Sequence, residues 1–229
     1  FSTYIPMSSS LIERIRSIQD SLPESVKLIA VSKKVGPAAI REAYAAGIRD
    51  FGESRIQEAQ SKIEQLQDLP GITWHFIGHL QSKKAKKALS YFQWLHSVDS
   101  LKLAQRLNLL AQELGVVPKI CLQVKILPDP NKSGWTIQQI LDDLTELNLC
   151  KNLQFEGLMT IPPLGLDSSE VIYVFNRTRE LIAEIDERNL SNIKMKQLSM
   201  GMSQDYQLAI QSGATMIRLG TILFGERQL

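Results

Sequence analysis

The feature that most constrains the fold is a repeat of apolar strand, turn and amphipathic helix that runs along the chain. Such a repeat predicts a parallel sheet with helices outside it, and eight units over this length favour a closed (β/α)8 TIM barrel. An open, doubly wound sheet is the alternative. The expected strands lie within 28–34, 48–53, 72–77, 94–98, 120–126, 155–161, 195–200 and 216–219. The expected helices cover 10–21, 37–46, 56–66, 82–91, 101–114, 137–147, 169–187 and 205–211.

The first expected strand ends in two lysines, Lys33 and Lys34. The carboxyl ends of barrel strands are where such folds keep their functional groups. Side chains alternate along a strand, so at most one of the two lysines points inward, and alternation does not say which. A lysine in this position is ordinarily a solvated charge. The alternative is a buried lysine whose amine forms a Schiff base with an aldehyde.

Two later strand ends are suited to a phosphate group. The turn Ser199–Ser203 combines glycine with two hydroxyl groups between a strand and a helix, where free N–H groups favour an anion. The segment Arg218–Thr221 closes the eighth strand, in the usual phosphate region of a barrel. Pyridoxal 5′-phosphate (PLP) would use the lysine, the phosphate cradle and the arginine, whereas a sugar phosphate in a Schiff-base aldolase would use two of the three. The other residues read at strand ends are Glu53, Ser54, His75, Gly78, Lys125, Met159 and Thr160.

Composition narrows the class of protein. The net charge of +2 does not indicate a nucleic-acid partner, and the basic cluster Lys83–Lys87 is interpreted as a solvated helix face. No apolar run reaches the roughly 18 residues of a membrane span, so no membrane partner is expected. The two cysteines lack metal-ligand spacing and favour a reducing compartment. Residues 1–6 are expected to be an expression remnant, and 7–229 a single domain.

A set of short motifs points to a known family. They are Ala30–Lys33, Phe51–Glu53, Trp74–Gln81, Gly157–Thr160, Leu198–Ser203 and Arg218–Thr221. In this combination and order the chain resembles the PLP homeostasis proteins, the family of bacterial YggS and human PROSC, and most of all its cyanobacterial members. The resemblance covers Met7 to Gly225. It implies PLP as the cofactor and a type III PLP fold, like the N-terminal domain of alanine racemase.

The resemblance also implies roles for single residues. Lys33 would carry PLP as an aldimine and Arg218 would face the pyridine nitrogen. Ser199 or Ser203, with Gly220 and Thr221, would hold the phosphate. The expected pocket further includes Met200, Gly201, Met159, Ser54 and His75; no catalytic residue and no metal ligand is expected. Two positions depart from the family pattern, because Ser54 and Lys83 stand where the family usually has asparagine.

An arginine opposite the pyridine nitrogen has consequences for chemistry. Arginine only donates hydrogen bonds, so the ring nitrogen stays unprotonated and is a weak electron sink. Racemisation also needs a second acid–base group, and the nearby candidates, Tyr206 and His75, are interpreted as structural. The expected function is therefore non-catalytic PLP binding in intracellular vitamin B6 homeostasis and amino-acid/keto-acid balance, by a cytoplasmic monomer whose partners are PLP-dependent apoenzymes. The alternatives are a weak PLP-dependent racemase and a PLP-responsive regulatory protein.

Overall fold

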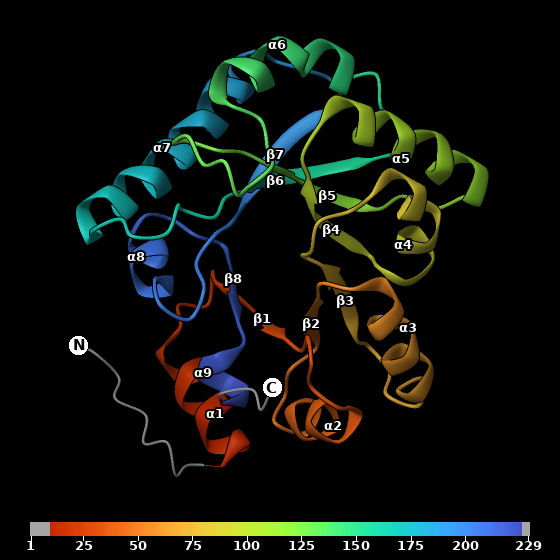
Figure 1. Cartoon of the computed structure of the whole chain (residues 1–229), viewed down its shortest axis with the longest axis vertical. Coiled ribbons are helices and arrows are strands. Elements are labelled where there is room, and N and C mark those ends of the chain that lie inside the picture. Colours follow the sequence, from red (N-terminus) through yellow and green to blue (C-terminus); the bar gives the residue numbers. More distant parts are fainter. Residues whose placement is uncertain (1–9, 226–229) are drawn as a thin grey trace.

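The computed structural model describes residues 10–225, which form a closed barrel of parallel strands surrounded by helices (Figure 1). The strands follow chain order around the barrel, and β8 pairs with β1 to close it. This closure confirms the predicted (β/α)8 barrel and excludes the alternative, an open doubly wound sheet. The strands are β1 (Lys27–Val31), β2 (Asp50–Glu53), β3 (Thr73–Phe76), β4 (Trp94–Val98), β5 (Lys119–Gln123), β6 (Gln154–Met159), β7 (Ile193–Ser199) and β8 (Met216–Leu219). The helices are α1 (Leu11–Ser21), α2 (Pro37–Ala45), α3 (Ile56–Gln65), η1 (Ser82–Lys84), α4 (Ala85–Tyr91), α5 (Leu101–Leu114), α6 (Ile137–Leu147), α7 (Ser168–Asp186), α8 (Tyr206–Gln211) and α9 (Thr221–Phe224).

The core has two parts because the strands bury both of their faces. A large apolar cluster fills the layer between the strands and the surrounding helices. A small cluster joins side chains from strands around the barrel, which can meet only in its interior. Its members are Ile29, Trp94, Cys121, Met159 and Met216. Polar side chains occupy much of the remaining interior, and they lead to the site described below.

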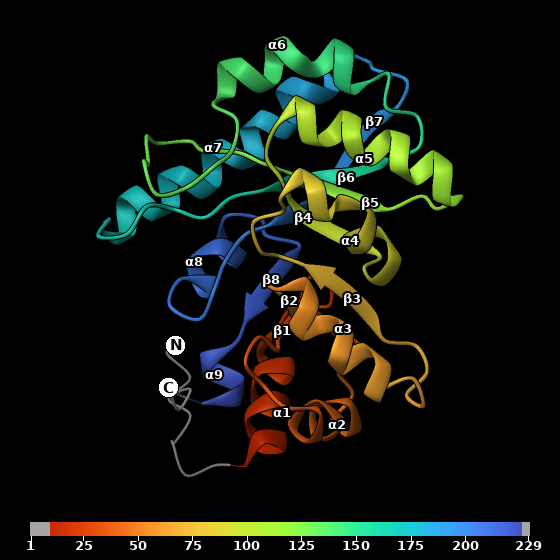
Figure 2. The same cartoon turned by 45° about the vertical axis from the view of Figure 1, so that its right-hand side comes forward.

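Helix starts follow local hydrogen-bonding chemistry. Ser10 and Glu13 form a capping box at the start of α1, in which each side chain accepts from the other residue's backbone N–H. Ser100 caps α5, because its hydroxyl accepts from the N–H of Leu103. Helices α1 and α9 lie side by side (Figure 2), and Arg14 on α1 donates to the carbonyl of Leu223 at 2.6 Å.

Several boundaries differ from expectation, most by one or two residues. The strand expected over 120–126 ends at Gln123; Val124 still donates to the carbonyl of Met159 at 2.9 Å and forms an isolated bridge with Trp135. The helix expected over 82–91 begins with a 3₁₀ turn, and the short helix α9 follows the last expected strand. Within residues 10–225, no helix combines the length and hydropathy needed to cross a membrane. The expected remnant, 1–6, lies outside the described residues.

Candidate functional site

A cavity of about 860 Å³ opens at the carboxyl ends of the strands. Its lining comes mostly from the segments that follow β1, β2, β6, β7 and β8, with Ile77 after β3 and Lys132 after β5. The expected site residues that line it are Lys33, Ser54, Ser203, Arg218, Gly220 and Thr221. The carboxyl ends of parallel strands meet at one end of a barrel, so residues far apart in sequence converge there.

Lys33 lies two residues beyond the end of β1 and is half-buried on the cavity wall. Lys34 is exposed and is not part of the lining. Alternation left open which lysine faces inward, and of the two it is Lys33 that lines the cavity. The backbone of Lys34 has a φ of 60°, in the left-handed region that side chains other than glycine rarely adopt.

Arg218 brings a buried positive charge to the same cavity from β8. It is 3% exposed, and its Nη1 donates to Ser199 Oγ at 2.6 Å. Burial lowers the pKa of Arg218 to about 10, which still leaves the guanidinium charged at neutral pH. The carboxylate of Asp205, which lines the same cavity, favours that charge. A ligand atom placed against Arg218 must therefore accept a hydrogen bond.

Behind Arg218, a chain of hydrogen bonds crosses the barrel interior, and we call it the interior relay. It consists of Arg218, Ser199, His96, His75 and Asp50, one residue from each of β8, β7, β4, β3 and β2. Ser199 Oγ lies 2.7 Å from His96 Nδ1, and His96 Nε2 lies 2.9 Å from His75 Nδ1. His75 Nε2 lies 2.8 Å from Asp50 Oδ1, at the start of β2.

The donors and acceptors of the interior relay have a single consistent order. The Asp50 carboxylate can only accept, so with both rings neutral His75 and His96 each carry their proton on Nε2; Ser199 then accepts from Arg218 and gives its one hydrogen to Nδ1 of His96. His96 then donates from Nε2 to His75, which donates from Nε2 to the Asp50 carboxylate. Both rings are neutral in this order, and burial lowers the pKa of His75 and of His96 accordingly. Burial alone would raise the pKa of Asp50, but the bond to His75 and the charge of Lys27 lower it overall.

The expected phosphate and pocket residues divide between the cavity wall and the layer behind it. Ser203 is on the wall, with its Oγ accepting from the N–H of Ile222 at 3.4 Å. Ser199 and His75 are fully buried in the interior relay and do not line the cavity. Met200 and Gly201 also lie behind the wall.

Gly201 shapes the turn that carries Ser203. Its φ is 101°, and a Cβ added there would lie 2.7 Å from the Cβ of Ala209 on α8. Only glycine therefore allows the turn to approach α8 this closely. Gly201 was expected to line the pocket; instead its backbone conformation sets the position of the turn that carries Ser203.

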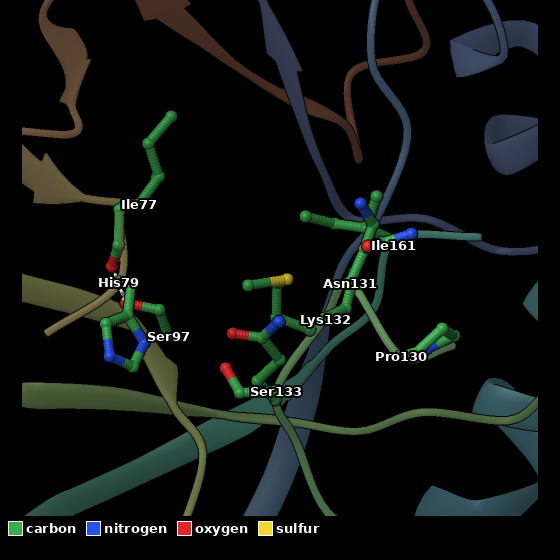
Figure 3. A pocket seen from close by; sticks show the side chains of 11 residues that line it. Ile77, His79, Ser97, Pro130, Asn131, Lys132, Ser133 and Ile161 are labelled. Atoms are coloured by element: carbon green, nitrogen blue, oxygen red, sulfur yellow. Dashed lines mark hydrogen bonds between the residues drawn. The ribbon is translucent and has the colours of Figure 1, made fainter. Parts of the chain in front are cut away.

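A second cavity of about 480 Å³ adjoins the first (Figure 3). The two share Ile77, Lys132 and Ile161, and Met159 lines the second cavity rather than the first. In Figure 3, His79 and Ser97 lie on one side of this cavity, and Pro130 and Asn131 on the other. Lys83, one of the two residues that differ from the family pattern, lines neither cavity and is exposed.

Several wall residues were not anticipated from the sequence. Lys132 and the segment 162–166 belong to loops between a strand and a helix. Their polar and proline-rich composition predicts a loop but does not predict that the loop lines the cavity. Met202 and Asp205 lie in the turn around Ser203. Their closeness in sequence to the expected phosphate residues could have indicated that they line the cavity.

Comparison with known proteins is consistent with this arrangement. Residues 8–228 match the family model for the alanine racemase N-terminal domain. The pyridoxal phosphate homeostasis protein of Synechocystis sp. is 53% identical over 207 residues, which are 90% of this chain and 94% of that protein. The homeostasis protein of Pseudomonas aeruginosa is 44% identical, over 90% of this chain and 86% of that protein.

Solved structures of PipY from Synechococcus elongatus are also similar. The structure without PLP has a TM-score of 0.91 and 52% identity, and it covers 94% of this chain and 100% of that chain. The structure with PLP bound has a TM-score of 0.90 and 50% identity, with the same coverage.

Proposed function

This chain belongs to the pyridoxal phosphate homeostasis protein family, and from that premise we propose that it binds PLP and acts in intracellular vitamin B6 homeostasis and amino-acid/keto-acid balance. The observation that carries the proposal is that Lys33, Arg218 and Ser203 all line one cavity. These residues match the aldehyde, the pyridine nitrogen and the phosphate of PLP. The related PipY has been solved with PLP bound.

Each wall of the cavity suits one part of the cofactor. The amine of Lys33 would add to the PLP aldehyde carbon; loss of the aldehyde oxygen as water would leave a Schiff base between lysine and cofactor. Ser203, Gly220 and Thr221 would hold the phosphate through hydroxyl and backbone N–H groups. Arg218 would donate to the pyridine nitrogen. Ser54, on the wall beside Lys33, would contact the cofactor, while Met159 would face the neighbouring second cavity.

The same residues support a binding protein in preference to an efficient enzyme. When bound, PLP supplies an electron sink, and that sink is weak if the ring nitrogen is unprotonated. The charged guanidinium of Arg218 favours an unprotonated nitrogen. A racemase would also need a second acid–base group at the cavity, yet His75 is engaged with Asp50 and His96, and the buried Tyr206 is not on the wall.

We further propose that the protein is a cytoplasmic monomer that passes PLP to PLP-dependent apoenzymes. The two cysteines, Cys121 and Cys150, are buried free thiols, which suits a reducing compartment. Transfer is tested by mixing the PLP-loaded protein with an apoenzyme and following the recovery of that enzyme's activity. Size-exclusion chromatography with light scattering tests the monomer.

The first experiment is the visible absorption spectrum of the purified protein with PLP, followed by borohydride reduction and peptide mapping. Borohydride converts a Schiff base into a stable amine, so the label should map to Lys33. Lys33→Ala should abolish the imine band, whereas Lys34→Ala, which changes the exposed neighbour, should retain it. A protein that stays colourless with PLP, or a label on another lysine, would contradict the proposal.

A further inference from the structure

A buried lysine on α3 lies directly behind the end of β1. Lys62 is 6% exposed, and its Nζ donates to three oxygens: Ser32 O at 2.7 Å, Glu53 Oε1 at 2.8 Å and Glu58 Oε1 at 2.7 Å. These three bonds use all the donors of the ammonium group. We call Lys62, Ser32, Glu53 and Glu58 the Lys62 cluster. It does not line the cavity.

The Lys62 cluster holds the backbone on both sides of Lys33. On one side, the carbonyl of Ser32 accepts from Lys62, and the Ser32 hydroxyl donates to Glu53 Oε1 at 3.0 Å. On the other side, the N–H of Lys34 donates to Glu58 Oε1. Lys34 is the residue with a left-handed backbone, a conformation that persists only when its surroundings hold it. Hydrogen bonds therefore fix the backbone of Ser32 and of Lys34, the residues on either side of Lys33.

The Lys62 cluster buries charged groups where apolar side chains could fill the same volume. Burying an ion pair often gives no more stability than apolar residues of the same volume. Here two carboxylates face one ammonium, and Glu53 Oε2 is a buried oxygen without a hydrogen-bond partner in residues 10–225. Burial raises the pKa of Glu53 as a result. A cluster retained despite this cost, with its bonds aimed at the residues flanking Lys33, suggests a role in geometry.

We propose that Lys62 is a positioning residue, which with Glu53 and Glu58 fixes the backbone of residues 32–34 so that the Lys33 amine is presented to the aldehyde of PLP. This inference rests on the proposed function. It assigns to α3, outside the cavity, a part in forming the Schiff base. Phosphate and ring recognition involve other strands, so the Lys62 cluster should affect the covalent bond and leave non-covalent docking unchanged.

Comparing two ligands distinguishes formation of the Schiff base from non-covalent docking. PLP can dock and form the Schiff base, whereas 4-deoxypyridoxine 5′-phosphate has the ring and phosphate but no aldehyde. Lys62→Met should raise the dissociation constant for PLP about tenfold, equivalent to about 1.4 kcal/mol, and leave that for the deoxy analogue unchanged. Glu58→Ala, which removes only the acceptor shared by Lys62 and Lys34, should act in the same direction more weakly. Lys87→Met, an exposed lysine on α4, is the matched control and should change neither constant.

The possible outcomes are distinct. If either variant weakens PLP and the deoxy analogue equally, the Lys62 cluster is merely structural and the inference is wrong; it is also wrong if neither constant changes. If Lys62→Met does not fold, Glu58→Ala decides the question by the same comparison, because Glu58 is partly exposed. If the unaltered protein shows no imine band and binds neither ligand, the proposed function itself has failed; if it binds both equally without an imine band, the Schiff base on Lys33, and with it this inference, is wrong.

Discussion

Replacing Ser199 with alanine should break the interior relay at its centre. The hydroxyl accepts from Arg218 at 2.6 Å and donates to His96 at 2.7 Å, and both neighbours are buried. Alanine leaves one charged donor and one ring nitrogen without this partner. Each buried group left unsatisfied costs about 1–3 kcal/mol, so the free energy of unfolding should fall by about 3 kcal/mol. For a chain of this size that corresponds to a decrease in Tm of about 6–12 °C.

Thermal and denaturant unfolding of the PLP-free protein measure this loss. The matched control is Thr178→Val in α7, which removes a buried hydroxyl that donates only to the carbonyl of Val174, one turn earlier. That change should cost less than about 1 kcal/mol, because it leaves no charged group unsatisfied. A loss for Ser199→Ala no larger than that of the control would refute the claim that Arg218 and His96 both depend on the Ser199 hydroxyl for a buried hydrogen bond.

The remaining predictions concern protonation and the turn at Gly201. Stability should fall as pH drops below about 6.5, because burial lowers the pKa of His75 and His96 in the folded state and the unfolded chain then binds more protons. In urea titrations at stepped pH, His96→Gln should flatten this dependence, whereas His79→Gln, at an exposed ring, should not. Nitrogen NMR should show both buried rings neutral with the proton on Nε2, and a proton on Nδ1 of either would contradict the deduced order. Gly201→Ala should weaken PLP binding about tenfold, measured by titration, because the added Cβ meets α8 and displaces the turn; unchanged affinity would show that the turn position is unimportant.

Much of the site could be predicted because barrel topology converts sequence position into spatial position. The alternation of strands and helices predicts a barrel, and a barrel gathers strand ends at one rim. Lys33, Ser203 and Arg218 are each recognisable as polar residues at such ends, and the cavity includes all three. The choice between Lys33 and Lys34 required either the structure or a family resemblance, because alternation gives two answers of equal weight.

The interior relay and the Lys62 cluster could not be predicted in the same way. Ser199 and His96 are 103 residues apart in sequence, and alternation shows that each can face inward without showing that they meet. Lys62 did carry a signal, since it falls on the buried face of α3 with Ile56 and Ala59. A lysine on an apolar stripe is easily interpreted as a long side chain that reaches solvent, so its ion pairs emerge only from the packing.

The interior relay also explains how a barrel can keep Arg218 charged in its interior. An isolated buried guanidinium would be strongly disfavoured, and Asp205 is the carboxylate that favours its charge at the cavity. The interior relay ends on a second carboxylate, Asp50, and its intervening members are neutral. Their dipoles all point the same way, since each group donates toward Asp50, and this order stabilises a positive charge at the Arg218 end. An arginine held charged in this way must donate into the cavity, so the chemistry available to PLP there depends on residues that never touch it.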